Sequence, residues 1–160
     1  VAKRQIEDGE NTHEGWVMIN DLVSKGYKYQ AACQLATLKP DRLTARQVAN
    51  GDESEFFVNI EYGKRIHKAL KDRFGEGDDK TIKTKEFTKE IVLSIQKLTN
   101  RKGVEWATDT MGKFINSLPG KDVADIKAAK STKVQRKDEK RKQILDKAFS
   151  FFLGQNNIKL

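Results

Sequence analysis

The chain has 160 residues, of which 31 are Lys or Arg and 23 are Asp or Glu, so its net charge at pH 7 is +8. Its single cysteine, Cys33, excludes an intramolecular disulfide and a cysteine-built zinc site, and no apolar run approaches the ~18 residues that a membrane span needs. The basic excess favours a polyanionic partner, of which nucleic acid is the commonest.

Two prolines and long stretches of strong helix formers predict a mainly α protein. We expect a small helical domain of about five to seven helices with at most one short strand, near residues 56–62. Four segments are predicted: a polar leader (1–13), a helical core domain (14–120), a basic arm or helix (121–143) and an apolar docking or oligomerisation helix (144–160).

Apolar residues recur at spacings of three and four in several segments, which is the pattern of one buried helical face. Thr44 and Thr84 are predicted N-caps, and Gly26, Pro40 and Pro119 stand where helices should end. The helix predicted at 104–118 is expected to bury Trp106. The segments predicted as helices are 13–25, 29–38, 44–49, 63–74, 84–98 and 104–118.

Residues 56–62 are rich in aromatic and β-branched side chains and are the one candidate strand. A strand there, followed by two helices, has the order of a ribbon-helix-helix, in which alternate strand side chains enter the major groove. Against this motif, Glu61 would face phosphate and the connector 75–83 is long; a buried strand or more helix are the alternatives. The side chains facing the groove would be either Val58 and Ile60 or Phe57, Asn59 and Glu61.

Residues 43–49 resemble the opening of the first helix of a helix-turn-helix, where an alanine packs against the recognition helix. The resemblance covers only these residues. Gly51 then falls too early, and the acids of Glu53-Ser54-Glu55 would stand at the start of the recognition helix, where phosphate contacts are normally made.

From residue 121 the apolar density falls and Lys and Arg accumulate, which predicts a solvated helix or a flexible basic arm. Several of these cations are three or four residues apart, so a helix would present them along one side for phosphate contact without reading of sequence. The alternative is a linker helix whose acids and bases pair with one another. The predicted nucleic-acid-binding residues are Lys127, Lys130, Lys133, Arg136, Lys137, Lys140 and Arg141, with a second patch at Lys64, Arg65, Lys68 and Lys71.

The C-terminal segment returns to apolar residues on one helical stripe, with Phe151 beside it. The stripe either docks on the chain's own core or serves as a partner or self-association helix. The predicted oligomerisation residues are Phe149, Phe152 and Leu153.

Signals for catalysis are weak: His13 and His67 belong to no ligand-spaced cluster, and Gly75-Glu76-Gly77 is followed by acids, the wrong charge for cradling phosphate. We therefore expect no enzyme, metal or cofactor.

The sequence predicts a non-enzymatic nucleic-acid-binding protein that binds DNA in preference to RNA and acts as a regulator, segregation or packaging factor. The expected location is the cytoplasm, nucleoid-associated or in a host cell, without membrane contact. The alternatives are a helical assembly subunit of a larger complex and a protein-binding adaptor or inhibitor.

Overall fold

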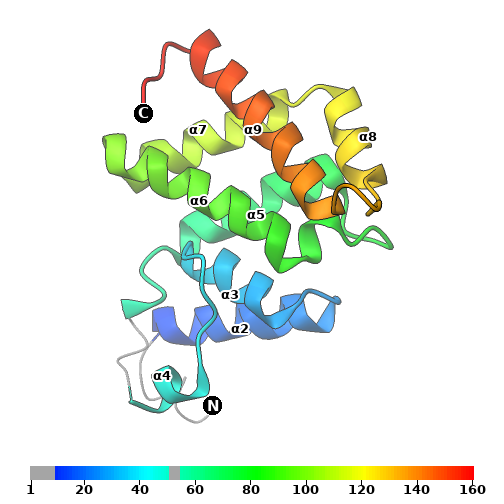
Figure 1. The fold of residues 1–160 in the computed structure, drawn as a ribbon. Helices are drawn as coiled ribbons and strands as arrows, with labels where there is room; N and C mark the ends of the chain where they lie inside the picture. Colours follow the sequence, from blue (N-terminus) through cyan, green and yellow to red (C-terminus); the bar gives the residue numbers. More distant parts are fainter. Residues whose placement is uncertain (1–9, 51–54) are drawn as a thin grey trace.

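The computed structural model describes residues 10–50 and 55–160, and the side chains of residues 10–12 are not described. Over these ranges the protein is all-α, with eight α-helices and no strand (Figure 1), which confirms the predicted fold class. The elements are α2 (Glu10–Ser24), α3 (Tyr29–Thr37), α4 (Ala45–Asn50), α5 (Ile60–Phe74), the 3₁₀ turn η2 (Thr81–Lys83), α6 (Lys85–Lys102), α7 (Val104–Ser117), α8 (Gly120–Ala128) and α9 (Lys137–Gln155).

Local signals place most helix ends. At the start of α4, Gln47 N donates to Thr44 Oγ1 (3.1 Å) while Thr44 N donates to Gln47 Oε1 (2.9 Å), a capping box that confirms the predicted N-cap. The helix α3 ends at Thr37, because Leu38 adopts a left-handed conformation with φ 53° and its N–H donates to Gln34 O. The leader prediction needs correction, since α2 begins at Glu10; residues 1–9 lie outside the described ranges.

The candidate strand at 56–62 is absent: residues 56–59 form an irregular turn and α5 begins at Ile60. The Phe57 ring is fully buried and packs edge-on against Trp16, with ring centroids 5.7 Å apart. The aromatic run therefore anchors a loop to the core instead of forming a strand. This removes the ribbon-helix-helix interpretation, because no strand is available to enter a groove.

The helix-turn-helix interpretation also fails within the described ranges. Among the described residues, the next α-helix after α4 is α5, and it begins at Ile60, further on than the turn of about three to four residues in this motif allows. The α4 helix has no fully buried residue, and only its Val48 packs, half-buried, against the core. Gly51, Glu53 and Ser54 of that prediction lie outside the described residues.

The core is built around α6, which packs against α3, α7 and α9, while α2 covers α3 and α8 lies on α9 (Figure 1). Predicted inward residues of α6 such as Ile91 and Ile95 are buried. The predicted basic arm is partly wrong, since its first part is the packed helix α8, with Ile126 fully buried. No helix of the described chain is long and apolar enough to span a bilayer.

The C-terminal stripe docks on the chain's own core, as the first of the two alternatives expected. Leu145 and Phe149 are buried, and the Phe149 ring meets Phe114 edge-on with centroids 5.1 Å apart. Phe152 contacts the same Phe114 ring at 5.5 Å and is half-buried. Phe151, by contrast, is 68% exposed.

The crossing of α3 and α5 predicts the effect of a matched pair of glycine substitutions. Gly63 is buried, and a Cβ there would collide with the backbone of Leu35, so Gly63→Ala should lower the free energy of unfolding by about 2 kcal/mol or more. Gly112 in α7 has open space around its Cβ position, so Gly112→Ala should raise it by about 0.5–1 kcal/mol. Urea denaturation of both variants measures this. Equal stabilities would contradict the close packing of α3 on α5.

Candidate nucleic-acid interface

The segment between α8 and α9, residues 129–136, is a hydrogen-bonded loop that we call the basic connector. Its Thr132 N donates to Gln135 O (2.8 Å), and Gln135 N donates back to Thr132 Oγ1 (3.0 Å). Ser131 Oγ accepts from the first amide of α9, Lys137 N (3.1 Å). Of the two expected alternatives, a solvated helix or a flexible basic arm, one continuous helix across 130–141 does not form, because Ser and Thr hydroxyls satisfy the backbone in a turn instead.

Arg141 joins the two helices that flank the basic connector, α8 and α9. Its side chain is 9% exposed, its Nε donates to Ile126 O in the last turn of α8 (2.9 Å), and its guanidinium lies 4.0 Å from Asp138. The guanidinium thus fixes the distance between the end of α8 and the start of α9. The prediction that Arg141 contacts phosphate needs correction, because the buried group is already used within the fold.

The other predicted cations of this region remain at the surface. All are exposed, and within the described ranges none forms an ion pair with a carboxylate. Asp138 and Glu139 lie among them in the first turn of α9, where they stabilise the positive end of the helix dipole. We call this set the connector cations: Lys127, Lys130, Lys133, Arg136, Lys137 and Lys140.

The second predicted patch, on α5, differs from the connector because most of its charges are paired. Lys64 lies 3.4 Å from Glu14 and Arg65 pairs with Asp109. Lys68 lies 2.7 Å from Asp72, whereas Lys71 is exposed and unpaired within the described chain. A phosphate would have to replace these carboxylates, so the α5 patch is the weaker contact surface.

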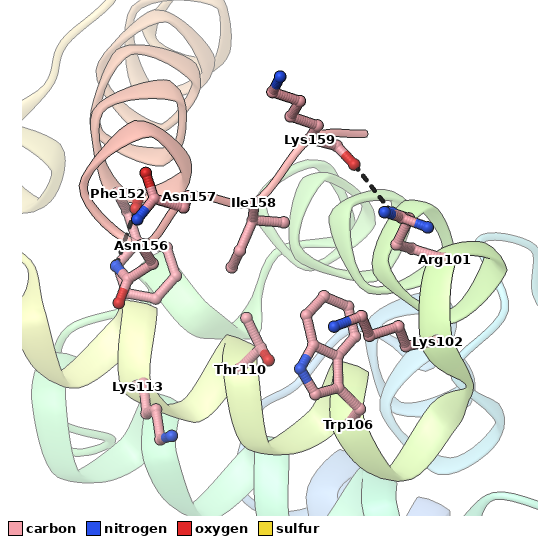
Figure 2. A pocket seen from close by; sticks show the side chains of 10 residues that line it. All are labelled: Arg101, Lys102, Trp106, Thr110, Lys113, Phe152, Asn156, Asn157, Ile158 and Lys159. Atoms are coloured by element: carbon pink, nitrogen blue, oxygen red, sulfur yellow. Dashed lines mark hydrogen bonds between the residues drawn. The ribbon is translucent and has the colours of Figure 1, made fainter.

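A pocket that the sequence does not predict lies at the other end of α9 (Figure 2). The prediction that Trp106 is buried is only partly correct, because its ring is half-buried and Lys102 Nζ lies 5.3 Å from the ring centroid. The C-terminal tail forms one wall, held by a hydrogen bond from Arg101 Nε to Lys159 O (3.1 Å). This hydrogen bond joins residues 58 positions apart, which no local pattern reveals.

A polar cluster joins α5 to the loop after it. Tyr27 donates its hydroxyl proton to Glu76 Oε2 (2.7 Å), and His67 Nε2 lies 2.9 Å from the same oxygen and 3.0 Å from the Tyr27 hydroxyl. Burial lowers the pKa of His67 more than the Glu76 carboxylate raises it. Burial opposes ionisation of Glu76, but the hydrogen bonds from Tyr27 and His67 outweigh it and lower the Glu76 pKa.

The described residues contain no group of His, Cys, Asp and Glu able to hold a metal ion.

These pKa shifts predict acid sensitivity. The folded state holds fewer protons on His67 and Glu76 than the unfolded chain, so unfolding takes up protons and the free energy of unfolding falls as the pH falls. The loss begins near the ordinary His value of 6.5 and continues through the ordinary Glu value of 4.5, with Lys25 and Lys71 also opposing His67 protonation.

Urea denaturation between about pH 7 and pH 4 measures this slope. His67→Gln should flatten its upper part, whereas His13→Gln, at an exposed position of α2, should not. An unchanged slope in His67→Gln would show that the cluster does not couple protonation to stability.

No family model, curated protein or solved structure matches this chain.

Proposed function

We propose that this protein binds nucleic acid without catalysis, holding phosphates with the connector cations. The observation that carries the proposal is that these cations are exposed and unpaired within the described chain, on and beside a loop ordered by its own hydrogen bonds. On α5, by contrast, three of the four predicted cations already have carboxylate partners. A concentration of unneutralised positive charge is costly by self-repulsion and is relieved by a polyanion.

The physics of such a contact favours binding that depends on salt and little on sequence. Each phosphate neutralised by Lys or Arg releases condensed counterions, which supplies the driving force. Lysine ammonium groups are point charges, suited to phosphate contact and not to bidentate base reading. Duplex DNA, with about one charge per 1.7 Å of axis, presents the dense row of phosphates that the basic connector suits.

The polar cluster of Tyr27, His67 and Glu76 has a structural role in this proposal. The side chains of His67 and Glu76 are only 15% and 18% exposed, and they bond to each other and to Tyr27. They fasten the loop after α5 to the start of α3. A regulator, segregation or packaging factor of the cytoplasm or nucleoid is the role that we infer for such a protein.

A matched pair of charge variants tests the proposal. Replacing Lys130, Lys133, Arg136 and Lys137 by Gln should weaken binding to a labelled random duplex, because fewer phosphates are neutralised. The slope of log affinity against log salt should become shallower by roughly 0.9 for each phosphate that the variant no longer neutralises. Fluorescence anisotropy across a salt series measures both quantities.

The control removes the same formal charge from α5, at Lys64, Arg65, Lys68 and Lys71. This variant should retain most of the affinity and slope, because three of its cations already have carboxylate partners. If the two variants bind the duplex equally weakly, only net charge matters and the basic connector is not the site. Absence of duplex binding by the native protein at low salt would overturn the proposal that it binds nucleic acid.

A specific observation favours a second candidate function, an assembly subunit. A groove of about 780 Å³ runs between α7, α8 and α9, and the exposed Phe151 lies along it with Ile144 and Pro119. An aromatic ring open to water beside an apolar groove is typical of a protein contact.

Self-association through this groove predicts a mass larger than that of the monomer in sedimentation equilibrium. Phe151→Ser should restore the monomer and leave the free energy of unfolding nearly unchanged, because Phe151 is exposed. Phe149→Ser, at the buried position two residues earlier, should instead lower stability by about 3 kcal/mol. A native protein that is monomeric at all concentrations would contradict self-association.

A further inference from the structure

The pocket beside Trp106 combines an aromatic surface with a ring of positive charge. Its cavity of about 250 Å³ lies between the end of α6, the first turns of α7 and the C-terminal tail (Figure 2). Arg101, Lys102, Lys113 and Lys159 line it, and no Asp or Glu does. The cavity is smaller than the roughly 300–1,000 Å³ of a drug-sized site, so its ligand has the size of a single planar ring system with a small anionic group.

The walls of the pocket are set by backbone contacts and not only by mobile side chains. Asn157 takes a left-handed conformation with φ 55°, and Ile158 N donates to Leu153 O (2.9 Å), which turns the tail back over α7. Arg101 Nε then donates to Lys159 O and holds the tail against α6. The space beside the indole therefore exists before any ligand arrives.

Lys102 covers the Trp106 ring in the free protein, and a ligand must compete with it. A solvent-exposed cation–π contact is worth about 0.5–1 kcal/mol, whereas a nucleic-acid base stacked on an aromatic side chain is worth about 1–3 kcal/mol. A base therefore displaces the lysine from the ring. The freed ammonium group, on a flexible stem, can then contact the phosphate of the same nucleotide.

We infer that this pocket binds one nucleotide unit, with its base stacked on Trp106 and its phosphate held by Lys102, Lys113 and Arg101. The inference rests on the proposed function and extends it from duplex to single-stranded nucleic acid. Every base has a face that can stack, and a base pair in a duplex does not expose it. The source of the nucleotide is either a strand or a free mononucleotide.

The Trp106 pocket and the basic connector lie at opposite ends of α9, which has 19 residues and is therefore about 28 Å long. Substitutions at the two sites should act independently, because groups this far apart share no partner. Duplex affinity should depend on the connector cations, and the stacking of an unpaired base should depend on Trp106.

The test uses a labelled short oligothymidylate, a labelled duplex and thymidine monophosphate, with the native full chain and the variants Trp106→Ala, Trp106→Phe and Lys113→Gln. Trp106→Ala should lower the single-strand affinity about tenfold and leave duplex affinity unchanged. Trp106→Phe, which keeps a ring, should retain most of the affinity, and Lys113→Gln should weaken it by a smaller factor. Circular dichroism shows whether each variant is folded. If Trp106→Ala is unfolded, the single-strand affinity of Lys113→Gln and the fluorescence of the native protein test the inference in its place.

Fluorescence of the native protein gives a direct readout, because a stacked base should quench Trp106 while the buried Trp16 supplies a constant background. Quenching by thymidine monophosphate as strong as that by the oligonucleotide identifies a free nucleotide as the ligand; quenching by the strand alone identifies single-stranded nucleic acid. Normal duplex binding with no quenching and no effect of the substitutions would overturn this inference and leave the proposed function intact. Absence of binding to all probes would overturn both.

Discussion

The exposure of the basic connector depends on the contacts that the buried guanidinium of Arg141 makes with α8 and with Asp138. A charged group out of water must be paired, and here one hydrogen bond to Ile126 O and the neighbouring Asp138 carboxylate meet that need. Because Ile126 is itself fully buried, the contact ties the end of α8 to the first turns of α9 at a fixed point of the core. Most residues between these points, Lys130, Lys133 and Arg136 among them, are exposed to water.

The difference between the two basic surfaces follows from their neighbours and not from their charge. On α5, Lys64 and Arg65 lie opposite Glu14 and Asp109 of adjacent helices, so their charges are balanced across helix contacts. At the basic connector the chain leaves the packed helices, and neither Lys130 nor Lys133 forms an ion pair within the described ranges. Net charge alone does not distinguish these surfaces; the fold does, and this is why only one of them is proposed as the main phosphate contact.

The sequence predicts the helices whose apolar residues recur regularly, and α6 and α7 lie almost where expected. It does not reveal α8 as a packed helix, because a nine-residue element that buries only Val123 and Ile126 gives a weak periodic signal. The aromatic run at Phe57 is misleading, since β propensity reports burial as well as strand geometry. The sequence places Arg141 at the surface, because a charge run shows composition and not the tertiary contact that buries one member. The Trp106 pocket needs contact with the C-terminal tail, which sequence periodicity cannot supply.

We propose that nucleic acid contacts this protein at the basic connector and leaves the α5 patch free. The most direct measurement is a nuclear magnetic resonance titration of the ¹⁵N-labelled protein with a short random-sequence duplex at low salt. We expect amide shifts concentrated over residues 127–140, with little change over α5. Shifts concentrated on α5, or spread evenly over the surface, would contradict it.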